Sequence, residues 1–168
     1  MEKWQYKVSR VILSNQISFN ETQNEANDKI NNKQSPIADE EIESFLSKDS
    51  LSLMATLDRE TAFDGADFIV IATPTNFDPD TNYFDTFSVD NVVEEALNSN
   101  DEALIIIKST VPVGHTKLLQ EKFNSKRVIF SPEFLREGQA LKDNLYPSRI
   151  IVGDHSEKAK KFADLLIE

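Results

Sequence analysis

Short apolar runs alternate with segments of helical periodicity from residue 35 onward. Strands inside a parallel sheet are apolar on both faces, because helices cover both sides of such a sheet. Four runs have this character, and we predict a strand at each of them: residues 68–72, 103–107, 127–130 and 149–152. Residues 51–57 predict one further strand.

The stretches between these runs carry apolar residues at helical spacing. Val89, Val92 and Val93, for example, share one face of a helix. Asp58 and Ser156 stand where each can cap a helix that follows it. We predict helices at residues 39–48, 58–65, 89–97, 116–123 and 136–142, and from residue 156 onward. Strands joined by helix-length connections predict an α/β fold with a doubly wound, mostly parallel, Rossmann-like sheet.

The first 34 residues differ in composition from the rest of the chain. Trp4, Tyr6 and Val8 alternate with polar residues, and residues 11–13 form a short apolar run, which indicates one strand or a hairpin. Residues 20–34 contain five asparagines and few apolar side chains. This composition favours a solvated loop or a frayed helix over an element of the core.

Composition and charge limit the chemistry. The 168 residues suit a single domain, and the net charge of −11 disfavours nucleic-acid and membrane-surface partners. The absence of cysteine excludes thiol catalysis and disulfides. The first of the four glycines is Gly65, so the first third of the chain has no glycine-rich phosphate loop. Short apolar runs and the lack of signal-peptide features predict a soluble cytoplasmic protein.

Polar residues follow three of the predicted strands. In an open parallel sheet, ligands bind beyond the carboxyl ends of the strands, near the point where the strand order reverses. The segments at these ends are residues 73–76, 108–114 and 131–138, and each contains a proline. Together they predict one polar rim formed by Thr75, Ser109, Thr110, Glu133 and Glu137. Strand termination and helix capping explain any one of these segments equally well.

Glu133 and Glu137 are the candidates for proton transfer. A carboxylate at a buried strand end, beside apolar Phe134 and Leu135, can serve as a general acid or base. The alternative for Glu137 is a carboxylate placed favourably at the start of a helix. Lys108 can pair either with an anionic ligand or with a neighbouring carboxylate.

No metal site is predicted. Residues 78–82 begin like a calcium loop, but Tyr83 and Val89 stand where that loop requires glycine and glutamate, so we interpret them as a solvated turn. His115 and His155 lie 40 residues apart and have no partner at metal-ligand spacing, which favours structural or capping roles.

Four motifs in order carry a resemblance to a known family. They read IATPTN, then YFD at residues 83–85, then IIIKSTVPVGHT, then IFSPEFLREGQALKDNLYPSRIIVG. In this order and spacing they resemble the N-terminal domain of the UDP-glucose 6-dehydrogenases, within the UDP-glucose/GDP-mannose dehydrogenase family. The resemblance covers residues 29–168.

The resemblance implies NAD as the cofactor and oxidation of UDP-glucose to UDP-glucuronate. It implies proton transfer by Glu133 and a catalytic water held by Thr110. The implied cofactor site consists of Thr73, Thr75, Ser109, Thr110, Val111 and Glu137. The implied substrate loop consists of Glu133, Phe134, Leu135, Arg136 and Glu137. Full-length members of the family are expected to be homodimers.

The chain departs from the family at both ends. Residues 1–28 lack the opening strand with its G-x-G-x-x-G motif, so we treat them as a divergent segment and residues 29–168 as a partial NAD-binding domain with an incomplete N-terminal βαβ unit. The family's nucleophilic cysteine, which holds the sugar between two oxidations, is also missing. We therefore expect a truncated form that is inactive alone. One alternative is a non-catalytic module that binds a nucleotide or docks on a full-length dehydrogenase. A second alternative is a merely structural remnant with exposed apolar surface.

Overall fold

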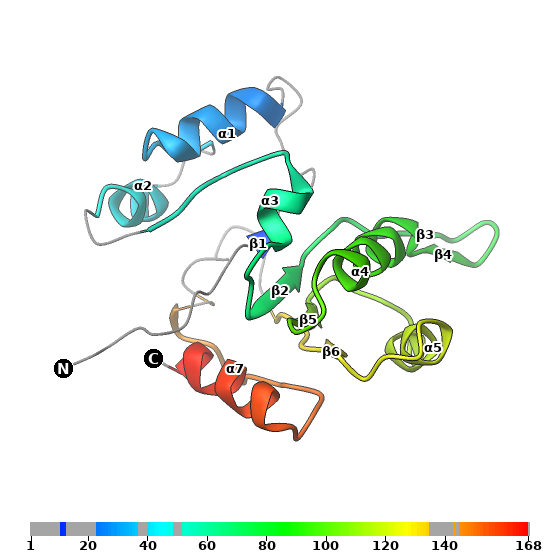
Figure 1. Cartoon of the computed structure of the whole chain (residues 1–168). Helices are drawn as coiled ribbons and strands as arrows, with labels where there is room; N and C mark the ends of the chain where they lie inside the picture. Colours follow the sequence, from blue (N-terminus) through cyan, green and yellow to red (C-terminus); the bar gives the residue numbers. More distant parts are fainter. Residues whose placement is uncertain are drawn as a thin grey trace.

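The computed structural model describes residues 11–12, 23–36, 40–48, 52–134, 143 and 145–167. Its centre is a four-stranded parallel sheet in the order β1-β2-β5-β6 (Figure 1). The strands are β1 (Val11–Ile12), β2 (Phe68–Ile71), β5 (Leu104–Ile107) and β6 (Val128–Phe130). All four lie within runs predicted from the sequence, β1 within residues 11–13, and the predicted Rossmann-like fold is confirmed. The expectation that residues 1–28 contain no opening strand is wrong, because β1 lies there and pairs parallel with β2.

The described residues also form helices. They are α1 (Gln23–Asn31), α2 (Glu40–Leu46), α3 (Arg59–Phe63), α4 (Phe87–Ser99), α5 (His115–Lys122) and α7 (Glu157–Ile167). The predicted caps are present, because Asp58 accepts from the backbone N–H groups of Glu60 and Thr61, and Ser156 accepts from that of Ala159. The helix predicted at residues 136–142 lies outside the described residues. No helix in the described part is long and apolar enough to cross a membrane.

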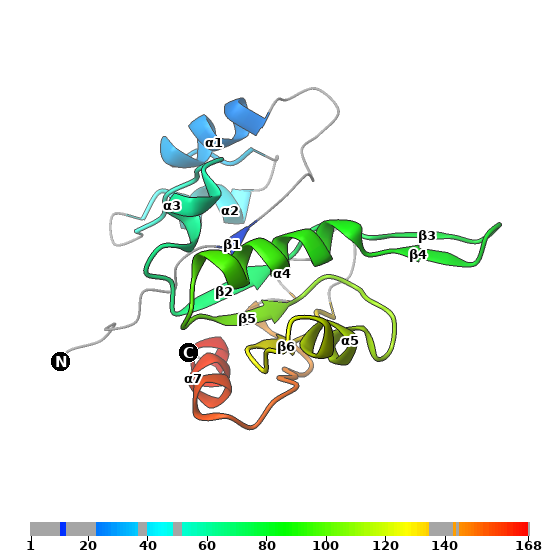
Figure 2. The same cartoon turned by 45° about the vertical axis from the view of Figure 1, so that its right-hand side comes forward.

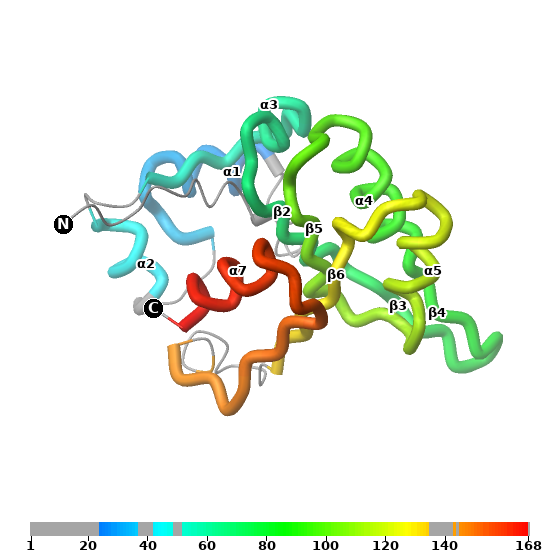
Figure 3. The backbone as a smooth tube through the Cα atoms, turned by 60° about the horizontal axis from the view of Figure 1, so that its bottom comes forward, coloured from blue at the N-terminus to red at the C-terminus, as the bar shows by residue number. Residues whose placement is uncertain are grey.

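The two faces of the sheet bury separate clusters of side chains. Ile69 and Ile105 pack with α4 and α5 on one face, whereas Val70 and Ile106 pack with α7 on the other. Figure 3 shows α7 on the opposite side of the sheet from α4 and α5. Every residue of β2 and β5 is buried, which explains why these strands lack polar positions. The sheet is therefore doubly wound.

The strand predicted at residues 51–57 is wrong. Residues 52–56 run outside the sheet, and Leu53 and Met54 are about half exposed, at 51% and 48%. The side chain of Asn31 bonds both the N–H and the C=O of Ala55, as a neighbouring strand would. A strand forms only beside another strand, because its backbone groups need partners. This apolar run has no neighbouring strand among the described residues.

The strand predicted at residues 149–152 is also wrong. These residues run beside the end of β6, where the Gly153 N–H donates to the Phe130 carbonyl and the Ser131 hydroxyl donates to the Ile151 carbonyl, but they form no ladder. A Cβ atom at Gly153 would lie 2.8 Å from the Phe130 oxygen, so this approach requires glycine. Ile151 is 42% exposed, because no layer of the described chain covers it fully.

A β-hairpin that the sequence analysis did not predict follows β2. Strands β3 (Asn76–Asp78) and β4 (Tyr83–Asp85) pair antiparallel and project away from the main sheet (Figure 2). The residues read as a solvated turn form its tip, where the Thr81 hydroxyl and the Asp80 N–H bond to Asp78 and lower its pKa. The hairpin places the loop after β2 close to the start of α4.

Candidate functional site

The loops that follow β2 and β5 are tied together by side-chain hydroxyls. The Ser109 hydroxyl donates to the Thr73 carbonyl at 2.6 Å, and the Thr75 hydroxyl donates to the Thr110 carbonyl at 2.8 Å. These bonds join two loops about 35 residues apart, since β2 and β5 are neighbours in register. The two loops therefore form one continuous edge at the carboxyl ends of the strands.

Thr73 and Ser109 support this edge from the interior of the protein. Both residues are buried, and the Ser88 hydroxyl lies 3.1 Å from that of Thr73 and bonds the Pro74 carbonyl. Because these hydroxyls bond inside the protein, they position the loops. Thr110, by contrast, is exposed. The predicted cofactor residues thus divide into buried supports and residues that a ligand can reach.

The far end of the second loop is fixed to α4. Gly114, the residue immediately before α5, has a φ of +88°, a conformation that residues with a side chain rarely adopt. The next residue, His115, places Nε2 2.7 Å from an oxygen of Asp90 on α4. The imidazole is mostly buried, so its role is the structural one expected of it. Asp90 itself was missed, because no sequence pattern relates two residues 25 positions apart.

Lys108 and Glu133 form an ion pair across neighbouring strand ends. The distance between Nζ and Oε1 is 3.1 Å, and the side chains are 16% and 35% exposed. Lys108 directly follows β5 and its backbone N–H donates to the Ile71 carbonyl, while Glu133 lies in the segment after β6. Of the two partners left open for Lys108, the structure shows the carboxylate of Glu133. The pair is held on adjacent strands, so its geometry is set by the sheet.

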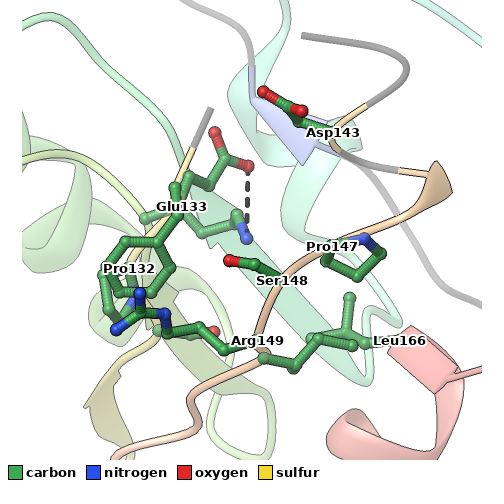
Figure 4. Close-up of a pocket in the computed structure, with 11 residues that line it drawn as sticks. Pro132, Glu133, Asp143, Pro147, Ser148, Arg149 and Leu166 are labelled. Carbon is green, nitrogen blue, oxygen red and sulfur yellow. Dashed lines mark ion pairs between the residues drawn. The ribbon is translucent and has the colours of Figure 1, made fainter. Parts of the chain in front are cut away.

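A cavity of about 70 Å³ opens beside this pair. Figure 4 shows Glu133, Ser148 and Arg149 around it, with Asp143 at one side. The guanidinium of Arg149 lies over the ring of Phe134, 4.8 Å from its centre. Ligand pockets usually measure about 300–1,000 Å³, so the described residues enclose only part of a site for a nucleotide or a sugar nucleotide.

Arg149 was not among the predicted site residues. Its run was read as a buried strand, and that interpretation hid its exposed guanidinium. Of the predicted substrate loop, Glu133 and Phe134 line the cavity. Leu135, Arg136 and Glu137 lie outside the described residues. Among the described residues no group of three histidine or acidic side chains is placed to hold a metal ion.

Comparison with known protein families shows to which family this chain belongs. Residues 12–167 match the NAD binding domain of the UDP-glucose/GDP-mannose dehydrogenase family. This chain belongs to that family. The members are NAD-dependent oxidoreductases, in agreement with the resemblance carried by the four motifs.

Individual relatives show the same family. UDP-glucose 6-dehydrogenase of Streptococcus pneumoniae is 52% identical over 145 residues, which cover 83% of this chain and 37% of that protein. The Campylobacter jejuni enzyme of the same name is 51% identical over 139 residues, covering 83% of this chain and 35% of the relative. The chain therefore spans just over a third of the length of these relatives.

Solved structures agree on the fold. A UDP-glucose dehydrogenase from Pyrobaculum islandicum superposes with a TM-score of 0.72 and 27% identity, covering 85% of this chain and 36% of that one. A GDP-mannose dehydrogenase from Pseudomonas aeruginosa gives a TM-score of 0.70 at 24% identity, covering 84% and 36%. Both are similar to this chain over the region that includes its sheet.

The described residues include the loops of one half of a dinucleotide-binding sheet. A dinucleotide-binding sheet consists of two mononucleotide halves, and the turn after its first strand carries glycines that let the backbone approach the pyrophosphate. The loops after β2 and β5 are present and tied together. Residues 13–22, which follow β1, contain no glycine. The family's usual phosphate cradle therefore has no counterpart in this sequence.

Proposed function

We propose that this chain carries the loops that meet cofactor and substrate in the NAD-dependent oxidation of UDP-glucose to UDP-glucuronate, and that these 168 residues by themselves do not complete the reaction. The observation that supports this most is the continuous edge at the carboxyl ends of β2, β5 and β6. Thr75 is bonded to Thr110 on that edge, and Lys108 is paired with Glu133 beside it.

Each residue on the edge has a proposed role. Thr75, Thr110 and Val111 form the surface that faces the cofactor, while Thr73 and Ser109 support it from below. Glu133 transfers a proton, because its carboxylate lines the cavity and is held by Lys108. Thr110 holds a catalytic water, since it is exposed and lies on the neighbouring strand end. Residues 133–137 form the substrate loop.

One feature of these residues supports the proposal that they do not complete the reaction. They contain no cysteine, whereas oxidation of an alcohol to a carboxylate in this family proceeds through a covalent thiolate adduct. Homodimerisation is proposed for the full-length relatives. We also propose a cytoplasmic location, supported by the short apolar runs and the lack of signal-peptide features in residues 1–10.

Calorimetry beside an NADH absorbance assay tests this function. We expect UDP-glucose to bind and NADH to remain at background. Glu133→Gln should weaken binding of UDP-glucose, whereas Glu121→Gln, a matched change on an exposed face of α5, should leave it unchanged. Steady NADH production by the purified chain would contradict the proposal that these residues do not complete the reaction. Absence of binding would contradict the proposed site.

A non-catalytic module is the second candidate function. The specific observation in its favour is that the ligand-facing loops are tied together in a chain that lacks the nucleophile. Such a module would hold a nucleotide or dock on a full-length dehydrogenase. Binding of UDP-glucose that is unaffected by Glu133→Gln would favour this module over a truncated catalytic domain.

A further inference from the structure

We infer that Asp90 and His115 form a positioning pair, which holds the loop of residues 108–114 in the shape that the proposed cofactor surface requires. The inference rests on the proposed function, because this loop carries Thr110 and Val111 of that surface. Neither Asp90 nor His115 is proposed to touch the cofactor. The pair acts on the cofactor through the backbone of the loop.

The first turn of α4 lies between the two ligand-facing loops. Val89 is fully buried and turns this part of the helix toward the core. Successive residues of a helix lie about 100° apart around its axis, so Ser88 and Asp90 flank Val89 on opposite sides. The Ser88 hydroxyl donates to the Pro74 carbonyl at 2.6 Å, in the loop after β2. Asp90 lies 2.7 Å from His115, at the end of the loop after β5. One helical turn thus contacts both loops.

The loop after β5 has few other contacts in its second half. The Thr110 carbonyl accepts from the Thr75 hydroxyl at 2.8 Å, and Val111 packs against the core. Val113 is fully exposed, so packing does not fix its position. The N–H groups of Val111 and Val113 donate no hydrogen bond to any residue that the structure describes. The next side-chain hydrogen bond along the chain is the one at the start of α5.

The backbone transmits the position of His115 to the loop. The His115 N–H donates to the Pro112 carbonyl at 3.0 Å, which closes a turn over residues 112–115. Gly114, within this turn, has a φ of +88°. Glycine adopts many other conformations at little cost, so the turn needs a contact that selects this one. The imidazole beside Asp90 supplies that contact.

The chemistry of the two groups defines how the ring is held. A carboxylate only accepts hydrogen bonds, so the Nε2 atom of His115 carries a proton. The side chains of His115 and Asp90 are 9% and 25% exposed, so little water competes for this bond. Nε2 keeps its proton in the neutral and in the charged ring alike. The bond therefore orients the ring whatever its charge.

Calorimetric titration of the 168-residue chain with NAD and with UDP-glucose tests the inference. Asp90→Ala removes the acceptor and should weaken NAD binding by about three- to tenfold, because a loop that must become ordered on binding lowers affinity. UDP-glucose binding should change less than about twofold, because the proposed substrate residues follow β6. Glu94→Ala, one turn further along α4 at an exposed position, also removes a carboxylate and should change neither affinity.

Conservative variants separate positioning from a general loss of packing. Asp90→Asn keeps an oxygen that accepts from Nε2, and His115→Gln keeps a donor, so both should bind NAD within about twofold of the unaltered chain. His115→Phe keeps a ring without a donor and should lose as much NAD affinity as Asp90→Ala. His155→Phe, the same change at the other histidine of the chain, which is exposed, should have no effect.

NMR of the ¹⁵N-labelled chain supplies a signature of the pair without ligand. The chain contains two histidines, so the spectrum of His155→Phe assigns the imidazole signals of His115. These signals should show a proton on Nε2, as a carboxylate partner requires. In Asp90→Ala, the amide signals that move most should belong to residues 108–114 and to the start of α5. A neutral His115 ring with its proton on Nδ1 would contradict the pair.

The binding outcomes separate the inference from the proposed function. If Asp90→Ala and His115→Phe bind NAD as tightly as the unaltered chain, the inference is wrong and the proposed function stands. If both variants weaken NAD and UDP-glucose alike, the pair supports the fold as a whole and the inference is wrong. If the unaltered chain does not bind NAD, the inference and the cofactor part of the proposed function are both wrong. If Asp90→Ala does not fold, the comparison of His115→Gln with His115→Phe decides the same question.

Discussion

Two regions of the molecule differ in how deeply their side chains are buried: the region that contains β2, β5 and β6, and the region of residues 23–57. In the first, whole strands are buried between helices, and Ile71, Ile105 and Ile107 are fully inaccessible. In the second, only Ala26 and Leu46 are buried among the described residues. The first region carries all the loops of the candidate site. The difference indicates that the site depends on one well-packed half of the fold and needs little from the other.

Truncation of a core side chain should produce the largest difference between the two regions. Ile106 is fully buried against α7, and Ile106→Ala should lower the free energy of unfolding by about 2–5 kcal/mol, because it removes buried methyl groups and leaves a cavity. Leu53→Ala, in the exposed segment, should change it by less than about 0.5 kcal/mol. Urea denaturation measures both. Equal losses would mean that residues 23–57 share the core.

Two asparagines allow a closer comparison, because each uses its side-chain amide to bond distant backbone. Asn100 donates to the carbonyls of Phe63 and Ala66 and accepts from the N–H groups of Glu102 and Ala103. Asn100→Ala should cost about 2–3 kcal/mol of unfolding free energy, since several partly buried backbone groups lose their partner.

Asn31→Ala is the counterpart in the other region. Asn31 bonds only Ala55, at an exposed position, so its loss should cost less than about 1 kcal/mol. The same denaturation experiment measures it. If Asn31→Ala cost as much unfolding free energy as Asn100→Ala, the Asn31 bonds would stabilise residues 52–56 more strongly than their exposure predicts.

The ion pair at the site should have a smaller effect on stability than Ile106 or Asn100. Lys108→Met removes the partner of the partly buried Glu133 and should cost about 1 kcal/mol. Lys117→Met breaks an exposed pair with Glu121, with Nζ and Oε1 3.9 Å apart, and should cost about 0–0.5 kcal/mol. Thermal unfolding of both variants checks the difference. Identical melting temperatures of the two variants would contradict the claim that the sheet fixes the geometry of the Lys108–Glu133 pair.

The smallest expected effect is a dependence of stability on acid. The hydroxyl and backbone N–H of Ser156 lower the pKa of Asp154, just before α7. A lowered pKa in the folded state stabilises the protein above the unfolded value of about 3.9, and this contribution is lost as the pH falls through the folded value. Asp154→Asn should therefore flatten the fall of stability below pH of about 4. An unchanged acid profile would contradict this contribution.

The sequence was sufficient where local pattern and burial agree. The all-apolar runs predicted β2 and β5, and Asp58 and Ser156 predicted helix starts, because a strand buried on both faces and a helix cap each have a local signature. The polar residues at the carboxyl ends were predicted to share one rim. The Thr75 to Thr110 bond and the Lys108 to Glu133 pair bring four of these segments' residues together.

The sequence did not predict the structure correctly where a segment depends on a neighbouring segment that is distant along the chain. Residues 51–57 have strand composition, but an extended segment joins a sheet only if a partner strand is present. Residues 149–152 are similar, and there Arg149 turns out to contact Phe134 beside the cavity. The β3–β4 hairpin was missed because its exposed aromatic residues do not resemble a buried strand. Such long-range arrangements cannot be read from local periodicity.

Hydrogen-exchange mass spectrometry of the chain with and without NAD tests the central claim most directly, that the site is built by the well-packed region alone. We predict slow exchange across β2 and β5 in the free chain, and added protection with NAD confined to peptides that cover residues 72–76 and 108–114. Peptides from residues 23–57 should exchange fast in both conditions. Added protection within residues 23–57, or none anywhere, would contradict the account.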